Sequence, residues 1–594
     1  MEKIKKIIYL LGSSERKSVG LLLIMILLMS ILDTVGVASI MPFLAILLNP
    51  ELIKTNSILN EIFIYFNFSN EKYFLLTIGF FVFFVFVSSL AFKALTIYLQ
   101  MRFIYMQEFN IGKRLIESYL RQPYKWFLNN QGTELGKNIL SEVSQVVNQA
   151  IGPMLNLIVH GMLVLAIFIL LIIFDTILTI SVVLVLILLY GIVFKLTKSW
   201  LITKGNESLK KNAWRYKIVT EVFSAIKEIK VKGIEDVYID RFILPAKKYA
   251  ENFTNLQIVS QLPRYFFEAI AFGGILIIAL YFLFKTDVTN YAIPAIALYA
   301  FAGYKIFPSL QQIFAATTSL RFVSSSLDVI YNDLRHLKSE IPNNNHNLLA
   351  FDKSINLEKI SFCYPNAVKF ALEDVTINIK VKSLVGFVGF TGSGKTTLVD
   401  IILGILEPQK GLLKIDDKII TKHNLRSWQS KIGYVPQQIY LADDTVANNI
   451  VFGLDTNNIN KENLERVAKV ADIHNFIINE LPKGYDTIIG ERGERLSGGQ
   501  RQRIGIARAL YQKPELLISD EATNALDNIT EELIMESILN LDNRPTIILI
   551  AHRLNSVKKC AQIFLLENGK ILVDGTYEYL KLHNNKFKKF TLGS

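Results

Sequence analysis

The stretch VGFVGFTGSGKTTLVDIIL, residues 385–403, decides the fold of the second half of this chain. It begins as an apolar strand, turns through glycines and ends as an amphipathic helix, and within it Gly389–Thr396 matches the P-loop pattern. Glycines let backbone N–H groups curl around phosphate oxygens at a helix N-terminus. Lys395 supplies a positive charge to the β- and γ-phosphates, and the Thr396 hydroxyl can coordinate Mg²⁺. The candidate nucleotide-binding residues of this loop are Gly389, Phe390, Thr391, Gly392, Ser393, Gly394, Lys395, Thr396 and Thr397.

A second motif that could take part in phosphate chemistry is PELLISDEATNALD, residues 514–527. Leu516–Ser519 reads as a short buried strand, and Asp520 and Glu521 stand at its exit. Two adjacent carboxylates can divide the work, with Asp520 in the Mg²⁺ shell and Glu521 polarising the attacking water as general base. A solvated acidic loop is the alternative interpretation of this motif taken alone.

The composition indicates a membrane half joined to a water-soluble half. The chain has 594 residues, of which 51% are hydrophobic and 20% charged, with a mean hydropathy of +0.33. That is too apolar for a soluble enzyme and too charged for a protein wholly inside lipid. The formal net charge of +12 suits nucleic acid, an anionic membrane face or an anionic ligand. Because the chain contains no nucleic-acid module, we expect a membrane rather than nucleic acid as its partner.

Six apolar runs precede the P-loop, and each is long enough to cross about 30 Å of hydrocarbon as a helix. They lie at roughly 19–48, 73–98, 150–174, 177–197, 262–284 and 291–310. Only Asp175 and Thr176 separate the third run from the fourth, which predicts a tight hairpin.

The distribution of basic residues predicts the orientation of these spans. Segments 1–18, 99–149 and 195–260 hold 5, 6 and 13 Lys and Arg residues, whereas the segments between the other span ends hold only Lys54, Lys72 and Lys285. Basic residues accumulate on the cytoplasmic side. We therefore expect a multi-pass membrane protein with both termini in the cytoplasm.

Shorter features are predicted around the spans. The breaks at 124–137 and 224–237 each suit a short crosswise helix in the cytoplasm. Residues 50–72 predict a small helix that either rests on the outer bilayer surface or packs against the spans. The N-terminus, residues 1–18, reads as an amphipathic helix on the inner membrane face, with a frayed terminus as the alternative.

The polar, asparagine-rich stretch at 339–354 reads as a linker. The predicted organisation is therefore a transmembrane domain at 1–338, this linker, and an α/β nucleotide-binding domain at 355–594.

Between the two phosphate motifs lies LSGGQRQR, residues 496–503. The order P-loop, LSGGQ, the strand ending in Asp520 and Glu521, and then AHR at 551–553 resembles the ATP-binding cassette of ABC transporters. The resemblance covers 355–590 and implies hydrolysis of ATP with Mg²⁺. Six spans with cytoplasmic extensions resemble the exporter class, so the expected fold is a six-helix exporter-type transmembrane domain followed by an α/β P-loop domain.

The resemblance assigns further residues to the ATP site. It implies that Tyr364 in FCYP stacks on adenine, and that Gln437 in YVPQ reaches toward Mg²⁺ and the attacking water. It also implies that His552 in AHRL contacts the γ-phosphate and that Asp527 lies at a dimer seam. The expected catalytic residues are thus Glu521, His552 and Gln437, and the expected Mg²⁺ ligands are Thr396, Gln437 and Asp520.

The resemblance also implies a homodimer. In this family the LSGGQ residues, here Ser497, Gly498, Gly499 and Gln500, cap the ATP of a facing domain. One chain carries one cassette and six spans, which is half a transporter, so two shared ATP sites are expected. GERG, residues 490–493, resembles the loop that touches the crosswise helices.

Three basic residues interrupt the apolar runs: Lys93, Arg264 and Lys305. At 1.5 Å per residue, Lys93 lies about 30 Å and Lys305 about 20 Å below the outer ends of their spans, while Arg264 lies near the cytoplasmic start of its own. Charge inside a membrane usually faces a cavity and marks a ligand path. We therefore expect these residues to contact an anionic, membrane-embedded substrate. The alternative is snorkelling to the inner interface, with an i,i+4 pair between Arg264 and Glu268.

Three stretches carry a second resemblance: IMPF (40–43), SSLDVIYNDLR (325–335) and IYLADDTVANNIVFG (439–453). They are similar to the PglK-type lipid-linked oligosaccharide flippases of bacterial N-glycosylation. This resemblance implies that Lys93, Arg264 and Lys305 occupy the places of basic cavity residues that engage pyrophosphate, and that segment 50–72 matches an external helix. Two of the three are lysine where arginine is usual, and Gln312 stands where another basic residue is expected.

This resemblance implies an ATP-driven flippase of a bacterial inner membrane that moves a polyprenyl-pyrophosphate-linked oligosaccharide from the inner to the outer leaflet. The alternatives are a lipid A exporter and a drug or peptide exporter. An ATP-gated channel is an alternative of another class, against which the intact hydrolytic residues argue.

Overall fold

The computed structural model describes residues 2–48, 50–66, 68, 70–285, 292–337, 349–365, 367–454, 459–490, 493–521, 527–551 and 554–592. The chain forms two compact units. The first comprises Met1–Gln122 and Trp126–Glu340, and the second comprises Ile341–Ser594 together with Pro123–Lys125. The division falls within the predicted linker at 339–354, of which residues 339–348 lie outside the described residues, so the linker itself stays a prediction.

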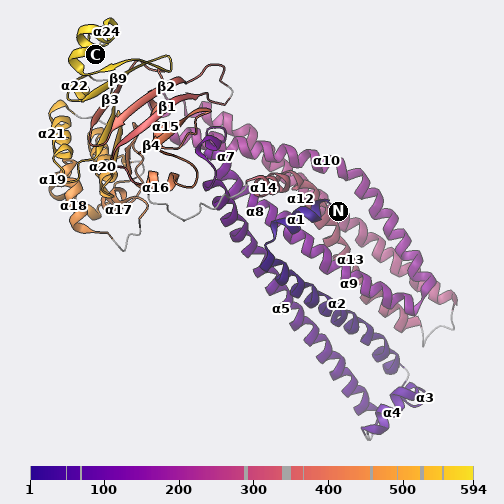
Figure 1. Cartoon of the computed structure of the whole chain (residues 1–594). Helices are drawn as coiled ribbons and strands as arrows, with labels where there is room; N and C mark the ends of the chain where they lie inside the picture. The colour runs from indigo at the N-terminus through magenta and orange to yellow at the C-terminus, as the bar shows by residue number, and fades with distance from the viewer. Residues whose placement is uncertain are drawn as a thin grey trace. The chain divides into compact units, whose positions relative to one another are not determined.

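Six long helices of the first unit carry the six apolar runs (Figure 1). They are α2 (Ser13–Leu48), α5 (Glu71–Leu120), α9 (Gly152–Phe174), α10 (Thr176–Ser224), α12 (Glu235–Lys285) and α13 (Ala292–Phe322). Helix α2 packs along α5 and α9, while α13 packs along α9 and α12. The predicted hairpin is confirmed, because α9 ends at Phe174, Asp175 is extended, and α10 begins at once.

Four helices of the described chain are long and apolar enough to cross a membrane. The number rises to five if α13 and α14 (Ser324–His336), which are bent by 57° to each other, count as one span. Helices α5, α10 and α12 continue far beyond the apolar runs, as expected for spans with helical extensions. The helix that leads into α9 contains two π-helical turns, Asn138–Glu142 and Val147–Ile151.

Short helices lie where the sequence predicts breaks. Residues 124–137 form α6 (Tyr124–Phe127) and α7 (Gly132–Lys137), and residues 224–237 contain α11 (Ile226–Lys232). Helix α8 (Val143–Val146) connects the two π-helical turns.

Residues 50–66 contain α3 (Leu52–Thr55) and α4 (Ser57–Tyr65), which pack against α2 and α5. Leu59 and Phe63 pack against a buried cluster that includes Phe74 at the start of α5. The ring centroids of Phe63 and Phe74 lie 5.3 Å apart. Other apolar side chains of this segment are exposed: Ile62, Ile64, Tyr65 and Phe66. The segment therefore packs inward on one face and presents an apolar surface on the other.

The N-terminal helix α1 (Glu2–Leu10) also packs against other helices. Ile7 and Leu10 are buried in a core shared with α5 and α14. Lys6 pairs with Asp328 of α14 at 2.9 Å. Ile4 and Ile8 of the same helix are exposed, so α1 packs on the bundle with one face, and its place on the membrane face stays a prediction.

The second unit contains two sheets. The six-stranded sheet has the order β10-β9-β3-β8-β7-β6, and all neighbours except β10 and β9 are parallel. Its strands are β3 (Leu384–Val388), β6 (Ile432–Val435), β7 (Leu516–Asp520), β8 (Thr546–Ile550), β9 (Gln562–Glu567) and β10 (Lys570–Gly575). The antiparallel sheet has the order β2-β1-β4-β5. Its strands are β1 (Ser354–Phe362), β2 (Leu372–Lys380), β4 (Lys410–Ile415) and β5 (Lys418–Ile419).

Helices surround these sheets, and parallel strands buried on both faces read as continuous apolar runs. The helices are α15 (Lys395–Ile402), α16 (Leu425–Gln429), α17 (Val446–Val451), α18 (Lys461–Val470), α19 (His474–Glu480), α20 (Gly498–Tyr511), α21 (Asn528–Leu539), α22 (Leu554–Val557), α23 (Tyr577–His583) and α24 (Asn585–Leu592).

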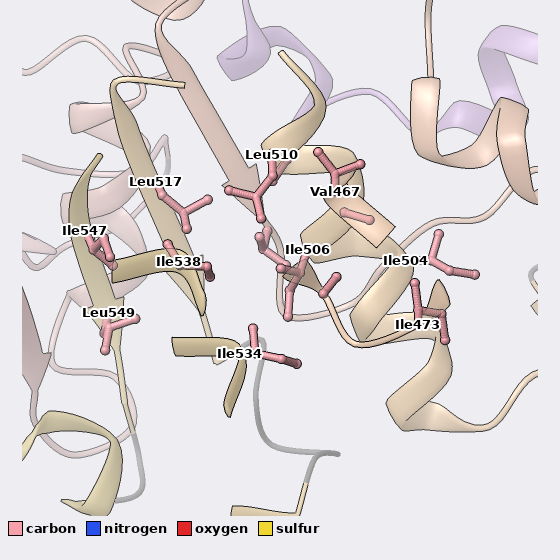
Figure 2. Close-up of a cluster of buried hydrophobic side chains, with 14 of the residues drawn as sticks. Val467, Ile473, Ile504, Ile506, Leu510, Leu517, Ile534, Ile538, Ile547 and Leu549 are labelled. Carbon is pink, nitrogen blue, oxygen red and sulfur yellow. The ribbon is translucent and has the colours of Figure 1, made fainter. Parts of the chain in front are cut away.

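Strand β3 contributes side chains to two separate apolar cores. Because alternate residues of a strand point to opposite faces, Leu384 and Val388 join a core with α18, α20 and α21, part of which Figure 2 shows. Val385 and Phe387 join a second core with α15 and the antiparallel sheet. The loop that follows β3 is therefore held by packing on both faces of the strand before it.

Shortening one central side chain tests this packing. Ile548 of β8 is fully buried in the second core. We expect Ile548→Ala to lower the free energy of unfolding of this unit by about 2–5 kcal/mol, because truncation removes apolar contacts and leaves a cavity. Hydrogen–deuterium exchange of peptides from β3 and β7 in the full-length protein measures the effect. Ile419→Ala on the exposed edge strand β5 is the control, and equal exchange in the two variants would contradict the assignment of the core.

Candidate functional site

The P-loop lies between β3 and α15, and glycine is required at both of its turns. Gly394, which precedes α15, has φ +102°, and a Cβ there would lie 2.6 Å from the Ala371 carbonyl oxygen. At Gly389 a Cβ would lie 2.3 Å from the Leu566 carbonyl oxygen. These close backbone approaches exclude side chains and leave the N-terminus of α15 accessible to an anion.

Lys395, the first residue of α15, folds back over the loop. Its Nζ donates to the carbonyl oxygens of Gly389 at 2.8 Å and Phe390 at 3.2 Å. Burial lowers the pKa of this ammonium, while the charges of Glu521 and Asp520 oppose that shift. A largely desolvated cation at a helix N-terminus, with carboxylates near it, fits the phosphates of a nucleotide.

The two carboxylates stand at the end of β7, as predicted. Asp520 is buried and closes the strand, while Glu521 follows it with a left-handed φ of 52°. Gln437 Nε2 donates to Glu521 Oε2 at 2.7 Å. The structure thus joins two of the expected catalytic residues across β6 and β7, and it excludes the interpretation of a solvated acidic loop for Asp520.

Two partly buried side chains near Asp520, Tyr434 and Asp400, were missed by the sequence argument. The Tyr434 hydroxyl on β6 donates a hydrogen bond to Asp520, and burial together with the charges of Asp520 and Asp400 raises the pKa of this tyrosine. Burial also raises the pKa of the Asp400 carboxyl to about 6, with Asp520 as a second cause. The sequence could have indicated both residues. Tyr434 lies on β6, next to β7 and shortly before Gln437, and Asp400 lies one helical turn after Thr396.

Tyr364 lies against the helix of the P-loop. Its hydroxyl oxygen lies 3.1 Å from Thr397 Oγ1, and its ring meets Phe362 edge-on with 5.1 Å between centroids. The structure therefore brings Tyr364 to the predicted site, while its stacking on adenine stays a prediction.

The LSGGQ residues form the start of α20. Ser497 Oγ accepts a hydrogen bond from the Gln500 backbone N–H at 3.2 Å, and Gln500 Oε1 accepts one from the Ser497 N–H at 2.8 Å. This capping box fixes the start of a 14-residue helix at Gly498 and Gly499. Such an N-terminus, free of side chains at its first two positions, suits a phosphate.

Asp527 caps α21, since its carboxylate accepts a hydrogen bond from the Thr530 backbone N–H at 3.2 Å. Its predicted place at a dimer seam stays a prediction. His552 lies outside the described residues, as do Glu491 and Arg492 of GERG.

The donor set at the P-loop fits Mg²⁺ as well as ATP. Thr396 offers a hydroxyl, Asp520 a carboxylate and Gln437 an amide oxygen, and Mg²⁺ prefers such oxygen ligands together with phosphates.

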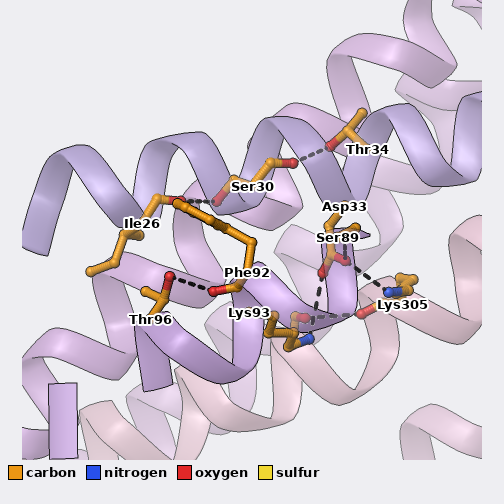
Figure 3. Close-up of polar contacts among 10 residues, drawn as sticks. Ile26, Ser30, Asp33, Thr34, Ser89, Phe92, Lys93, Thr96 and Lys305 are labelled. Atoms are coloured by element: carbon orange, nitrogen blue, oxygen red, sulfur yellow. Dashed lines mark hydrogen bonds and ion pairs between the residues drawn. The ribbon is translucent and has the colours of Figure 1, made fainter. Parts of the chain in front are cut away.

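The three predicted substrate residues are all ion-paired (Figure 3 shows the pairs of Lys93 and Lys305). Lys93 Nζ lies 3.4 Å from Asp33 Oδ2, and Lys305 Nζ lies 3.2 Å from Asp33 Oδ1. Arg264 Nε donates to Glu268 Oε1 at 2.6 Å, the i,i+4 pair that formed the alternative interpretation. Glu268 therefore neutralises Arg264, and Asp33 balances one of the two lysines, so these groups together keep one formal positive charge.

Asp33 is the residue that the sequence argument missed in the membrane half. It stands within the first apolar run, and a carboxylate in such a run is itself a sign of a functional or paired position. Gln312, which stands where the resemblance to PglK-type flippases leads us to expect a basic residue, is exposed on α13.

Comparisons with known proteins agree with this arrangement. Residues 17–309 match the ABC transporter transmembrane region and residues 372–524 match the ABC transporter family. The ATP-dependent lipid A-core flippase of Alkalilimnicola ehrlichii is 30% identical over 502 residues, 80% of each chain. The heterocyst differentiation ATP-binding protein HepA of Nostoc is 32% identical over 64% of this chain and 61% of that protein.

A solved structure of a bacterial Atm1-family ABC exporter with ATP bound shares the fold. The two align with a TM-score of 0.78 over 97% of this chain and 98% of that one, at 21% sequence identity. With an exporter-type transmembrane domain followed by a P-loop nucleotide-binding domain, the chain belongs to the ABC transporter family and couples ATP hydrolysis to transport.

Proposed function

We propose that this protein is a homodimeric flippase of a bacterial inner membrane that moves a lipid with a phosphorylated head group from the inner to the outer leaflet. The observation that carries this proposal is the cluster of Asp33, Lys93 and Lys305 inside the spans. One carboxylate faces two ammonium groups, so the cluster keeps one formal positive charge where hydrocarbon disfavours it. A negatively charged head group that enters the bilayer supplies the missing counter-ion.

The finer substrate we propose is a polyprenyl-pyrophosphate-linked oligosaccharide. The support is the similarity of residues 40–43, 325–335 and 439–453 to PglK-type flippases, and the apolar surface that α4 presents beside the outer ends of α2 and α5. Lipid A-core is the second candidate, which the relatives of that name favour. Both lipids carry phosphate groups, so the cluster suits either.

The ATP site supplies the energy through defined residues. Glu521 accepts a proton from the attacking water while the water oxygen bonds to the γ-phosphorus, the bond from that phosphorus to the β–γ bridging oxygen breaks, and ADP leaves. Gln437 orients Glu521 through their hydrogen bond. Lys395 and the amides before α15 stabilise charge on the phosphates. Thr396, Asp520 and Gln437 would hold Mg²⁺, which offsets phosphate charge when bound.

The N-terminus of α20 completes the site of the other subunit in this proposal. Ser497 is exposed and its helix start is preformed by the capping box, so a partner's nucleotide can dock on it without rearrangement. Two such contacts, related by a two-fold axis, make two composite ATP sites.

Removing the base tests the assignment of Glu521. We expect Glu521→Gln to lower ATP turnover by about 10²–10⁴-fold, because the amide cannot take the proton, while ATP binding remains. Phosphate release and nucleotide filter binding measure the two effects. Glu515→Gln, at the other end of the same strand segment and paired with Lys431, is the matched control. Equal turnover in both variants would show that Glu521 is not the base.

Mixed dimers test the shared sites. Lys395→Ala and Ser497→Arg should each abolish ATP turnover alone, because each spoils both sites of a homodimer. Co-expression and purification of the mixed dimer should restore one intact site, and so about half of the wild-type turnover if the sites act independently. Activity no higher than in the separate variants would mean that each site is built within one chain.

Reconstitution tests the cargo. We expect ATP-dependent transfer of a labelled polyprenyl-pyrophosphate-linked oligosaccharide in proteoliposomes, lost in Glu521→Gln and reduced in Lys305→Ala. Transfer of labelled lipid A-core alone would select the second candidate. If Lys305→Ala transported either lipid at the wild-type rate, the cluster would have no part in substrate binding.

A further inference from the structure

The group that we define as the Asp33 cluster, Asp33, Lys93 and Lys305, joins three helices. Asp33 comes from α2, Lys93 from α5 and Lys305 from α13 (Figure 3). Ser89, one turn before Lys93, donates its hydroxyl to Asp33 Oδ1 at 2.9 Å. The carboxylate is 2% exposed, whereas the Lys305 side chain is 16% and the Lys93 side chain 32% exposed.

The Asp33 cluster contains one more ammonium group than a structural ion pair requires. A buried carboxylate needs compensation, and one ammonium with a hydroxyl donor supplies it. Here a second ammonium is present, and Lys305 also lies 5.7 Å from the centre of the Phe86 ring. Each ammonium has three N–H donors, and its contact with Asp33 takes one. Lys93 and Lys305 thus retain donors for a further anion, and their exposure exceeds that of the carboxylate.

We propose that Asp33 is an internal anion that competes with the substrate's phosphate for Lys93 and Lys305, and so sets how readily the head group is released. The inference rests on the proposed function and deepens it, since it assigns a negative residue to a site that the sequence argument built from cations alone. Asp33 and an incoming phosphate repel each other while both attract the same two ammonium groups.

Two consequences follow from the Coulomb balance. Asp33 holds the lysines in place before the lipid arrives, which avoids two uncompensated charges in the bilayer. Asp33 also weakens phosphate binding, because a like charge within a few ångströms opposes it. A transporter needs such weakening, since a head group bound too tightly would stay at the site through the cycle.

The experiment uses the full-length protein in nanodiscs of phosphatidylcholine, with farnesyl pyrophosphate as the probe and farnesol as its uncharged control. The dissociation constant and the dissociation rate are measured for the wild type and for Asp33→Asn. We expect Asp33→Asn to bind farnesyl pyrophosphate at least about tenfold more tightly and to release it more slowly, because one repulsive charge is gone. Farnesol should bind both proteins equally.

A charge series keeps the test decisive if Asp33→Asn folds poorly. Lys305→Gln should bind more weakly than the wild type, and the double variant Asp33→Asn/Lys305→Gln should regain affinity, because it restores the balance with a single ammonium. Glu117→Gln, on the same helix as Lys93 and paired with Lys113, is the matched control and should keep the wild-type affinity.

Each outcome decides one question. Asp33 is not a competitor if Asp33→Asn binds farnesyl pyrophosphate no more tightly than the wild type and the double variant binds it no more tightly than Lys305→Gln. That result would leave the proposed function standing. If the wild type binds farnesyl pyrophosphate no better than farnesol, the proposal that the cargo carries a phosphorylated head group is wrong, and this inference is wrong with it.

Discussion

A fixed charge inside a bilayer must find a counter-charge, and this constraint shapes the membrane half of the protein. Asp33 satisfies Lys93 and Lys305 only in part, because one carboxylate meets two ammonium groups. Arg264 is satisfied locally by Glu268, on the next turn of its own helix. The two arrangements differ. The first joins three helices and leaves one positive charge in excess, whereas the second is a neutral pair within one helix. The account of cargo therefore rests on the first.

The soluble half obeys a different constraint, the close approach of backbone to phosphate. Packing on both faces of β3 fixes the loop from Gly389 to Gly394, and β6 and β7 bring Gln437 to Glu521. Asp520 is held by Tyr434 from the neighbouring strand. The catalytic groups thus come from the carboxyl ends of adjacent parallel strands, where an α/β sheet places its ligands.

Much of this was readable from the sequence, and the exceptions have physical reasons. The P-loop, the strand before Asp520 and Glu521, and the hairpin at Asp175 follow from local patterns, and the structure has them at those residues. Asp33, Tyr434 and Asp400 were missed because their importance comes from partners far away in the chain. The amphipathic pattern of helix α1 predicts a helix at these residues, but it does not say which of its apolar side chains meet lipid and which meet other helices. Periodicity finds elements, but contacts between elements decide the roles of charged groups.

In this proposal, the excess charge of the Asp33 cluster receives the phosphate of the cargo lipid. Solid-state NMR can test this directly, by the dipolar coupling between ¹⁵Nζ-labelled lysine and the ³¹P nuclei of bound farnesyl pyrophosphate in membranes. The account predicts a coupling from lysine nitrogens in direct contact with phosphorus, which disappears when Lys93 and Lys305 are both replaced by glutamine. A coupling that survives this double replacement, or none in the wild type when the ligand is bound, would contradict it.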